Sequence, residues 1–330
     1  MITWDILEKL RPLTQEEQQC RQNNNQVDWF TYNAALIHQV QAARLLTPGK
    51  LISARPHTRF AYFPPHTHDY IELIYMCSGS TTHYINGEKV ILQTGELLLL
   101  GPHTIQEIEP AGAEDIAVNF IILPEFFDKS LAMLGAENTP LRQFILDGLC
   151  LDGGDSDYFH YQVANVLPIQ NLIENMLWTL VFDVPNKRQV NQTTLGLLFL
   201  QLLNFTDRIS FHNEEQKGMV QLYRYIEENF RTASLAEAAA LLGYDIYHLS
   251  RQIRKKTGRT FLDIVQEKRM LQAAFLLKNT ALQVGEISVA VGYENTSHFH
   301  RLFRKYFNCA PKQYRTQAAV FHQMLSNKEF

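Results

Sequence analysis

The order of apolar and polar positions divides the chain into stretches of different periodicity. Residues 1–50 are polar, with apolar positions such as Leu36, Ile37, Val40 and Leu45 at helical spacing, which predicts short helices before a breaker at residues 47–49. From Leu51, short runs of β-forming residues alternate with turn signals, which predicts a small β-barrel or sandwich. The expected strands are residues 60–63, 70–77, 81–85, 89–92, 96–100 and 116–123, with a type I′ hairpin turn at Asn86-Gly87.

Helical periodicity returns after Pro124, where the predicted strands stop. A loop is expected at residues 152–155, followed by two apolar helices between residues 162 and 204. Helices this apolar must bury a face, either against the barrel or against a second copy of the chain. A polar stretch at residues 213–217 is the predicted linker to a helical C-terminal region.

The net charge changes sign near this predicted linker. The whole chain has a net charge of −4, but residues 1–216 hold 13 Lys and Arg against 25 Asp and Glu, a net of −12. Residues 217–316 hold 16 against 8, a net of +8. Because phosphate repels acidic surfaces, we expect only the C-terminal region to meet a polyanion.

Other features of the sequence concern the compartment. The four cysteines are far apart and show no CxxC or CxxH spacing, which argues against a disulfide framework and against a zinc finger. The N-terminus has no continuous apolar run, and nowhere do about 18 apolar residues follow one another. We therefore expect a soluble, cytoplasmic protein with no membrane partner.

A tandem repeat is the most specific feature of the chain. Residues 234–244 match residues 283–293, and residues 248–255 match residues 298–305, with one extra residue in the second copy. Each copy has an apolar helix, a Gly-Tyr turn and a second helix with basic side chains, which is the layout of a helix-turn-helix motif. We expect the turn glycines, Gly243 and Gly292, to end the first helices in a left-handed conformation.

The second helix of each copy is predicted to have a buried face and a DNA-binding face. Apolar residues four apart give the buried face, Leu249 with Ile253 and Phe299 with Phe303. The opposite face carries side chains that donate to base edges and phosphates. The candidate DNA-binding residues are Tyr247, Ser250, Arg251, Arg254, Lys255, Thr296, Ser297, His300, Arg301, Arg304 and Lys305.

Two pairs of these candidates occupy matched positions in the repeat. For Arg251 and Arg301 we expect contact with bases or the groove, whereas a solvated helix face is the alternative for Lys255 and Lys305. Residues 261–278 predict one connecting helix about 27 Å long. This length suits two recognition helices in neighbouring major grooves, about 34 Å apart.

The C-terminal region resembles the AraC/XylS family of transcription regulators from Leu222 to Arg315. The matching motifs include Leu249-Ser-Arg, Lys256-Thr-Gly-Arg-Thr-Phe261, Arg269, Val291-Gly-Tyr293, Phe303-Arg-Lys305 and Ala310-Pro311. Ile253 stands where the family usually has an aromatic residue, and Asn308 where it usually has glycine. The resemblance implies sequence-specific binding of double-stranded promoter DNA, usually by an activator that contacts RNA polymerase.

The predicted barrel carries a cluster of polar residues at one strand. Alternation along this strand places His66, His68 and Glu72 on one face with Tyr70. With Gly79 after it, the segment resembles the first motif of the cupin barrel, although Phe60 stands where that motif opens with glycine. In the AraC family such a barrel senses a small molecule, often a sugar, and the helices after it form a homodimer. The candidate ligand-binding residues are His66, His68, Tyr70, Glu72, Tyr84 and His103.

The second cupin motif departs further from the family pattern. Gln106 stands where the metal-binding histidine of that motif falls, and His103 is shifted three residues earlier. Because a neutral amide is a weak ligand for transition metals, we expect no metal, no cofactor and no enzyme activity.

These features together predict an α+β protein with a cupin-like β-barrel, flanking helices and an all-α domain with two helix-turn-helix motifs. The expected domains are residues 1–50 (helical extension), 51–135 (effector-binding barrel), 136–212 (helical packing or dimerisation segment), 213–217 (linker), 218–317 (DNA-binding domain) and 318–330 (tail). The expected function is transcription regulation in response to a small molecule. Two alternatives stay open: a metal-dependent cupin enzyme with a DNA-binding tail, and a DNA-binding protein without a ligand.

Overall fold

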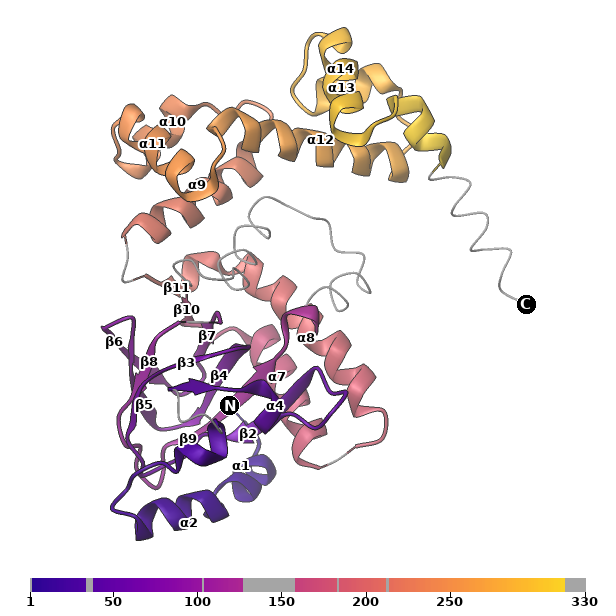
Figure 1. The fold of residues 1–330 in the computed structure, drawn as a ribbon. Helices are drawn as coiled ribbons and strands as arrows, with labels where there is room; N and C mark the ends of the chain where they lie inside the picture. The colour runs from indigo at the N-terminus through magenta and orange to yellow at the C-terminus, as the bar shows by residue number, and fades with distance from the viewer. Residues whose placement is uncertain are drawn as a thin grey trace, which may run out of the picture. The chain divides into compact units, whose positions relative to one another are not determined.

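The computed structural model describes residues 2–33, 38–102, 104–126, 158–182, 184–211 and 214–317. The chain divides near residue 212 into two compact units, each with apolar clusters of its own. The N-terminal unit is built on strands and the C-terminal unit on helices, which confirms the predicted α+β class (Figure 1). Leu36, Ile37 and the loop predicted at residues 152–155 lie outside the described residues.

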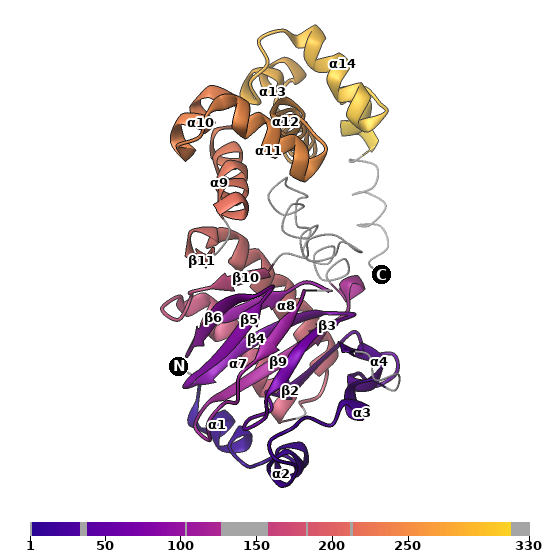
Figure 2. The ribbon, with the colours of Figure 1, turned by 60° about the vertical axis from the view of Figure 1, so that its left-hand side comes forward.

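Two sheets make up the N-terminal unit. One has the strand order β1-β3-β8-β5-β6, and the other has the order β11-β10-β7-β4-β9-β2. The pairing of β1 with β3 is parallel and the other pairings are antiparallel; Figure 2 shows β4, β9 and β2 side by side. The strands are β1 Gln39–Val40, β2 Ile52–Pro56, β3 Phe63–His68, β4 Ile71–Ser78, β5 Ser80–Ile85, β6 Glu88–Gln93, β7 Leu97–Leu100, β8 Gln106–Ile108, β9 Ile116–Ile122, β10 Tyr158–Tyr161 and β11 Ile209–Ser210.

Several strand predictions need correction. Val40 lies in β1, not in a helix, and residues 60–62 precede the strand that begins at Phe63. Strands do not stop at Pro124, because β10 pairs with β7 and with β11. These short strands are stabilised by pairing with distant segments, so four or fewer residues carry too little local preference to reveal them. The hairpin turn is confirmed, since Asn86 and Gly87 have φ angles of 52° and 86°.

Helices come both before and after most strands of the N-terminal unit in the sequence. The helices before and between the first strands are α1 Trp4–Leu10, α2 Gln15–Gln22, α3 Trp29–Tyr32 and α4 Ala42–Leu45, and those that follow are α7 Leu167–Val181 and α8 Lys187–Asn204. The Tyr75 hydroxyl of β4 donates to Gln170 Oε1 of α7 at 2.7 Å, and Gln170 Nε2 donates to the Gly95 carbonyl at 2.9 Å. Helix α7 therefore covers the sheet, and it also contacts α8 and α1. This arrangement fits the barrel-packing alternative for α7.

The C-terminal unit consists of the two predicted helix-turn-helix motifs and two longer helices. Its helices are α9 Glu214–Asn229, α10 Leu235–Leu242, α11 Ile246–Thr257, α12 Phe261–Asn279, α13 Val284–Ala290 and α14 Thr296–Phe307. In Figure 1, α12 runs from the α10–α11 pair to the α13–α14 pair. Residues 214–217 of the predicted linker form the first turn of α9 instead. This end of α9 packs on the first motif, since a Cβ on Gly218 would lie 2.9 Å from the Tyr244 ring.

The turns of the two motifs have the predicted backbone. Gly243 and Gly292 adopt φ angles of 70° and 88°, which confirms the left-handed ends of α10 and α13. Asn308 follows α14 with φ of 55°, so asparagine takes the left-handed position where the family usually has glycine.

Candidate DNA-binding surface and barrel pocket

Helices α11 and α14, called the recognition helices below, begin at side-chain caps. Asp245 Oδ1 accepts from the backbone N–H groups of Tyr247 and His248, and Asn295 Oδ1 accepts from that of His298. Their buried faces are as predicted, because Leu249, Ile253, Phe299 and Phe303 are all 0% exposed. The other faces are therefore fixed toward solvent.

The structure brings together the candidate DNA-binding residues of each recognition helix. Tyr247 is 79% exposed, and every other candidate is exposed except His300, which is half-buried. Arg251, Arg254 and Arg304 form no ion pair with an acidic side chain in the described part of the chain. One open depression is lined by the whole candidate set of α14: Thr296, Ser297, His300, Arg301, Arg304 and Lys305.

One contact on this surface was not predicted from the sequence. Arg301 Nη2 donates to His298 Nδ1 at 3.0 Å, one turn earlier on α14. The imidazole holds the guanidinium at the start of the helix and leaves its other N–H groups available to donate. His298 matches His248 of the first repeat, and this correspondence was the available signal.

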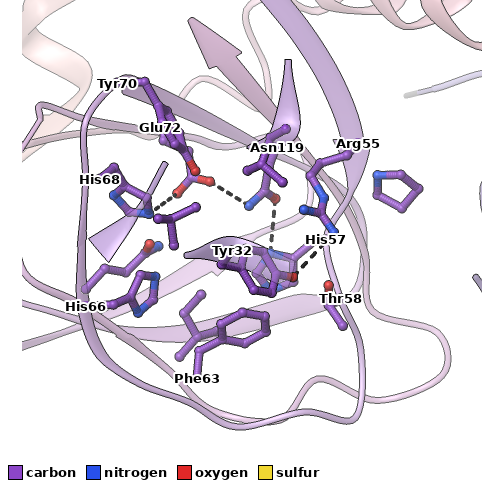
Figure 3. A pocket seen from close by; sticks show the side chains of 15 residues that line it. Tyr32, Arg55, His57, Thr58, Phe63, His66, His68, Tyr70, Glu72 and Asn119 are labelled. Carbon is purple, nitrogen blue, oxygen red and sulfur yellow. Dashed lines mark hydrogen bonds and ion pairs between the residues drawn. The ribbon is translucent and has the colours of Figure 1, made fainter. Parts of the chain in front are cut away.

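The second candidate site is a pocket in the N-terminal unit, called the barrel pocket below. The space between its lining residues is about 380 Å³ when open solvent at the mouth is counted, of which about 40 Å³ can hold the centres of water-sized molecules. Strands β2, β3, β4, β8 and β9 line it together with the segment from α3 to α4 (Figure 3). Its residues are Tyr32, Val40, Leu45, Arg55, Pro56, His57, Thr58, Phe63, His66, His68, Tyr70, Glu72, Gln106, Ile108 and Asn119.

Four of the six predicted ligand-binding residues lie in this pocket, namely His66, His68, Tyr70 and Glu72. Tyr84 does not: its hydroxyl donates to Glu109 Oε1 at 2.8 Å, while its neighbour His83 is fully buried. His103 lies outside the described residues. Tyr32, Arg55, His57 and Asn119 could not be found from the sequence, because they come from separate segments and belong to no motif.

A chain of hydrogen bonds orients the polar side chains of the barrel pocket. Asn119 Nδ2 donates to Glu72 Oε1 at 2.8 Å, so its Oδ1 accepts from His57 Nδ1 at 3.0 Å (Figure 3). This network assigns the proton of His57 to Nδ1 and leaves Nε2 as an acceptor. His68 Nε2 lies 3.7 Å from Glu72 Oε2.

Gln106 is held in the same way. Its Nε2 donates to His83 Nδ1 at 3.1 Å, and His83 Nε2 donates to Thr81 Oγ1 at 2.8 Å. Gln106 Oε1 then remains as an acceptor. Within the described residues, four buried atoms of the barrel pocket have no hydrogen-bonding partner: His57 Nε2, His68 Nδ1, Glu72 Oε2 and Gln106 Oε1.

The charges around the barrel pocket follow from burial. Burial lowers the pKa of His57 and of His66 to about 4, and lowers the pKa of His68 far below its usual value, so these imidazoles are neutral near pH 7. Burial also raises the pKa of Glu72 to about 7, against the opposing effect of the Asn119 hydrogen bond. Arg55 forms an ion pair with Glu16 of α2. The described lining residues therefore offer no unpaired cation.

The structure also locates the two departures from the cupin motifs. Phe60 has a φ angle of 66°, so it adopts the left-handed backbone that glycine favours. Arg21 and Arg59 lie 5.2 and 5.7 Å from the centroid of its ring. Gln106 is fully buried and occupies the pocket wall, and the described residues contain no group of three His, Cys, Asp or Glu side chains placed to hold a metal ion.

Comparison with known families covers both units. Residues 48–203 match the model of the AraC-like ligand binding domain, and residues 238–317 match that of a helix-turn-helix domain. The chain belongs to the AraC family. It is thus a transcription regulator with a ligand-binding domain and a helix-turn-helix DNA-binding domain.

Named relatives of this AraC-family regulator align along most of its length. It is 25% identical over 270 residues to the HTH-type transcriptional activator RhaS of Mannheimia succiniciproducens, covering 80% of this chain and 93% of that protein. It is 22% identical to RhaR of the same organism, covering 77% and 88%. It also resembles the C-terminal domain of the response regulator yesN from Fusobacterium nucleatum, with 34% identity, a TM-score of 0.28, and coverage of 28% of this chain and 93% of that domain.

These relatives favour a regulator over an enzyme, since the names of RhaS and RhaR describe transcriptional activators. Among the described residues, no helix combines the length and the apolar character needed to cross a bilayer.

Proposed function

We propose that this AraC-family regulator activates transcription when a small, neutral, hydroxyl-rich molecule such as a sugar binds in the barrel pocket. The recognition helices α11 and α14 bind promoter DNA, RNA polymerase is the partner in activation, and the working form is a homodimer. The DNA-binding role is supported by two exposed basic helix faces in the region of residues 217–316, which has a net charge of +8.

The observation that carries the choice of effector is the set of acceptor atoms in the barrel pocket. His57 Nε2, Gln106 Oε1 and Glu72 Oε2 are buried without partners in the described structure and suit a ligand that donates several hydrogen bonds. A phosphate or carboxylate would need a cation, but Arg55 is already paired with Glu16. Hydroxyl groups satisfy acceptors without bringing in charge, so a neutral polyol fits best.

The effector proposal is tested by calorimetric titration of the full-length protein with neutral monosaccharides, sugar phosphates and sugar acids. We expect a neutral monosaccharide to bind and the charged compounds not to bind. Glu72→Gln should weaken that binding by about 10- to 100-fold, the usual loss for a hydrogen bond to a charged group. Tyr84→Phe is the control, because Tyr84 lies outside the pocket. Binding of a sugar phosphate alone would contradict the proposal. If none of the compounds binds, the result would favour a DNA-binding protein without a ligand.

The matched positions of the repeat give a second prediction, on sequence recognition. Arg251→Ala or Arg301→Ala should cost about 1–3 kcal/mol on the cognate operator and little on random DNA, because a guanidinium near the start of a recognition helix can bind guanine with two hydrogen bonds. Each loss of preference should be confined to one half of the site.

The lysines one turn later are the matched controls. Lys255→Ala or Lys305→Ala should weaken binding to all sequences alike and lower the salt slope by about one unit per lost phosphate contact. Competition binding on a library of operator variants measures both effects. If the arginine variants lose affinity uniformly, the arginines contact phosphate and the specificity must come from other side chains of the recognition helices.

A further inference from the structure

One side chain of the connecting helix joins both repeats. Arg269 on α12 donates from Nε to the Phe230 carbonyl at 2.7 Å and from Nη2 to the Arg231 carbonyl at 2.8 Å. Its Nη1 donates to the Gly292 carbonyl at 3.3 Å. Phe230 and Arg231 follow α9 and lead into the first motif, whereas Gly292 is the turn of the second motif. The guanidinium also lies 5.2 Å from the centroid of the Tyr293 ring.

The turn of the second motif is docked at the same place. A Cβ on Gly292 would lie 2.5 Å from the Arg231 carbonyl oxygen, so this close approach needs glycine. Phe230 packs against the apolar cluster of the second motif, which includes Phe299 and Phe303. The matching glycine of the first motif, Gly243, has open space around its Cβ position. The docking is therefore specific to the second turn and is not a general property of the repeat.

We propose that Arg269 is a positioning residue that sets the distance and angle between α11 and α14, and thereby the spacing of the two half-sites that one chain reads. The inference rests on the proposed DNA-binding function. A helix of 19 residues joined to each motif by a short turn fixes a length of about 28 Å, but it does not fix the rotation of one motif about the helix axis. Arg269 supplies that constraint, because its rigid planar fork binds the carbonyls of the segment that leads into the first motif and the carbonyl of the second motif's turn at once.

The dependence of DNA affinity on the spacing between the two half-sites tests this constraint. One inserted base pair moves a half-site by about 3.4 Å along the duplex and rotates it by about one tenth of a turn. A rigid pair of recognition helices then loses one set of base contacts. A pair that is free to rotate follows the displaced half-site. A residue that only stabilises the fold would instead change affinity by the same factor at every spacing.

The chain offers a matched control in Arg315. Its Nε donates to the Leu277 carbonyl at 3.1 Å and its Nη2 to the Leu282 carbonyl at 2.6 Å, so it also binds two backbone carbonyls. Both carbonyls belong to the end of α12 and the connection to α13, on the side of the second motif. Arg315→Ala therefore removes contacts of the same kind without separating the two motifs.

The experiment uses the full-length protein and an operator selected by the wild type from a random duplex library. Affinities are measured for that operator, for versions with one or two base pairs inserted or removed between the half-sites, and for each half-site alone. The wild type should lose about 10- to 100-fold per changed spacing, comparable with the loss of one set of base contacts. Arg269→Ala should bind the selected spacing about tenfold more weakly and show spacing penalties within about threefold, with unchanged affinity for single half-sites.

Two further variants complete the test. Arg269→Lys should behave like Arg269→Ala, because a single ammonium cannot bind three carbonyls in a plane. Arg315→Ala should keep the spacing profile of the wild type. The role of Arg269 would be overturned if Arg269→Ala lost as much affinity as the wild type at each changed spacing, or if Arg315→Ala tolerated changed spacings as well as Arg269→Ala does. It would also be overturned if the wild type showed no preference for spacing. If the wild type binds none of the fragments, it is the proposed DNA-binding function that fails.

Discussion

Replacing Arg59 by methionine should lower the free energy of unfolding of the N-terminal unit by about 3–5 kcal/mol, because the substitution leaves a buried carboxylate without its partner. Arg59 Nε donates to Glu17 Oε1 at 2.7 Å and Nη2 donates to Glu17 Oε2 at 3.1 Å. Both side chains are buried, at 5% and 1% exposure. The Arg59 guanidinium also donates to the carbonyls of Arg11, Pro12 and Ala113, so it holds the start of the chain on the barrel.

The measurement is urea unfolding followed by tryptophan fluorescence. All three tryptophans, Trp4, Trp29 and Trp178, belong to the N-terminal unit, so the signal reports that unit alone. Adding Glu17→Gln to Arg59→Met removes the uncompensated charge and should recover part of the lost stability. A double variant that loses the sum of the two single effects would show that the charge pairing does not carry the effect.

The barrel pocket should make stability depend on pH through Glu72. Relative to Glu72→Gln, the wild type should lose up to about 3 kcal/mol between pH 4.5 and 7. The sign follows from the pKa of Glu72, which burial raises from 4.5 to about 7: the folded state binds this proton more tightly than the unfolded state. The contribution of Glu72 is therefore fully present below pH 4.5 and is lost as the pH rises through 7.

The comparison with Glu72→Gln is needed because the histidines act in the opposite direction. His57 and His66, with pKa values lowered from 6.5 to about 4, make the folded state bind fewer protons, so their contribution rises with pH over that range. Urea unfolding of both proteins at a series of pH values gives the difference directly. A difference that stays constant from pH 4 to 8 would contradict a buried Glu72 that titrates near neutrality.

The sequence predicted the C-terminal unit better than the barrel. The repeat could be recognised because each motif is local: its buried residues lie four apart, and its turn glycine lies one or two residues after the end of the first helix. The extra residue in the second copy lies in the turn, because two residues separate Gly243 from the start of α11 at Ile246, whereas three separate Gly292 from the start of α14 at Thr296. Arg269 appeared only as part of a family motif, since its partners at Phe230 and Gly292 lie far from it in the sequence.

The barrel pocket was predicted only where it depends on one continuous segment. His66, His68, Tyr70 and Glu72 were found because they lie within seven residues. His57, directly after β2, and Asn119 of β9 reach the same place through strand pairing that alternation along one strand does not reveal. The prediction of Tyr84 as a ligand-binding residue differs from the structure, because its neighbours His83 and Ile85 take the inward positions of β5 and Tyr84 faces outward.

The strand order of the N-terminal unit has a consequence for how the two units acquire their structure. Strand β2 pairs with β9, and β7 pairs with β10, so the six-stranded sheet closes only when segments distant in the sequence meet. In the C-terminal unit most contacts are instead between helices that follow one another along the chain, although α12 also contacts α9 and α14. Domains with such local contacts fold in about microseconds to milliseconds, and sheets with distant pairings in about milliseconds to seconds. The C-terminal unit, although synthesised last, should therefore reach its native form sooner after its chain is complete than the barrel does.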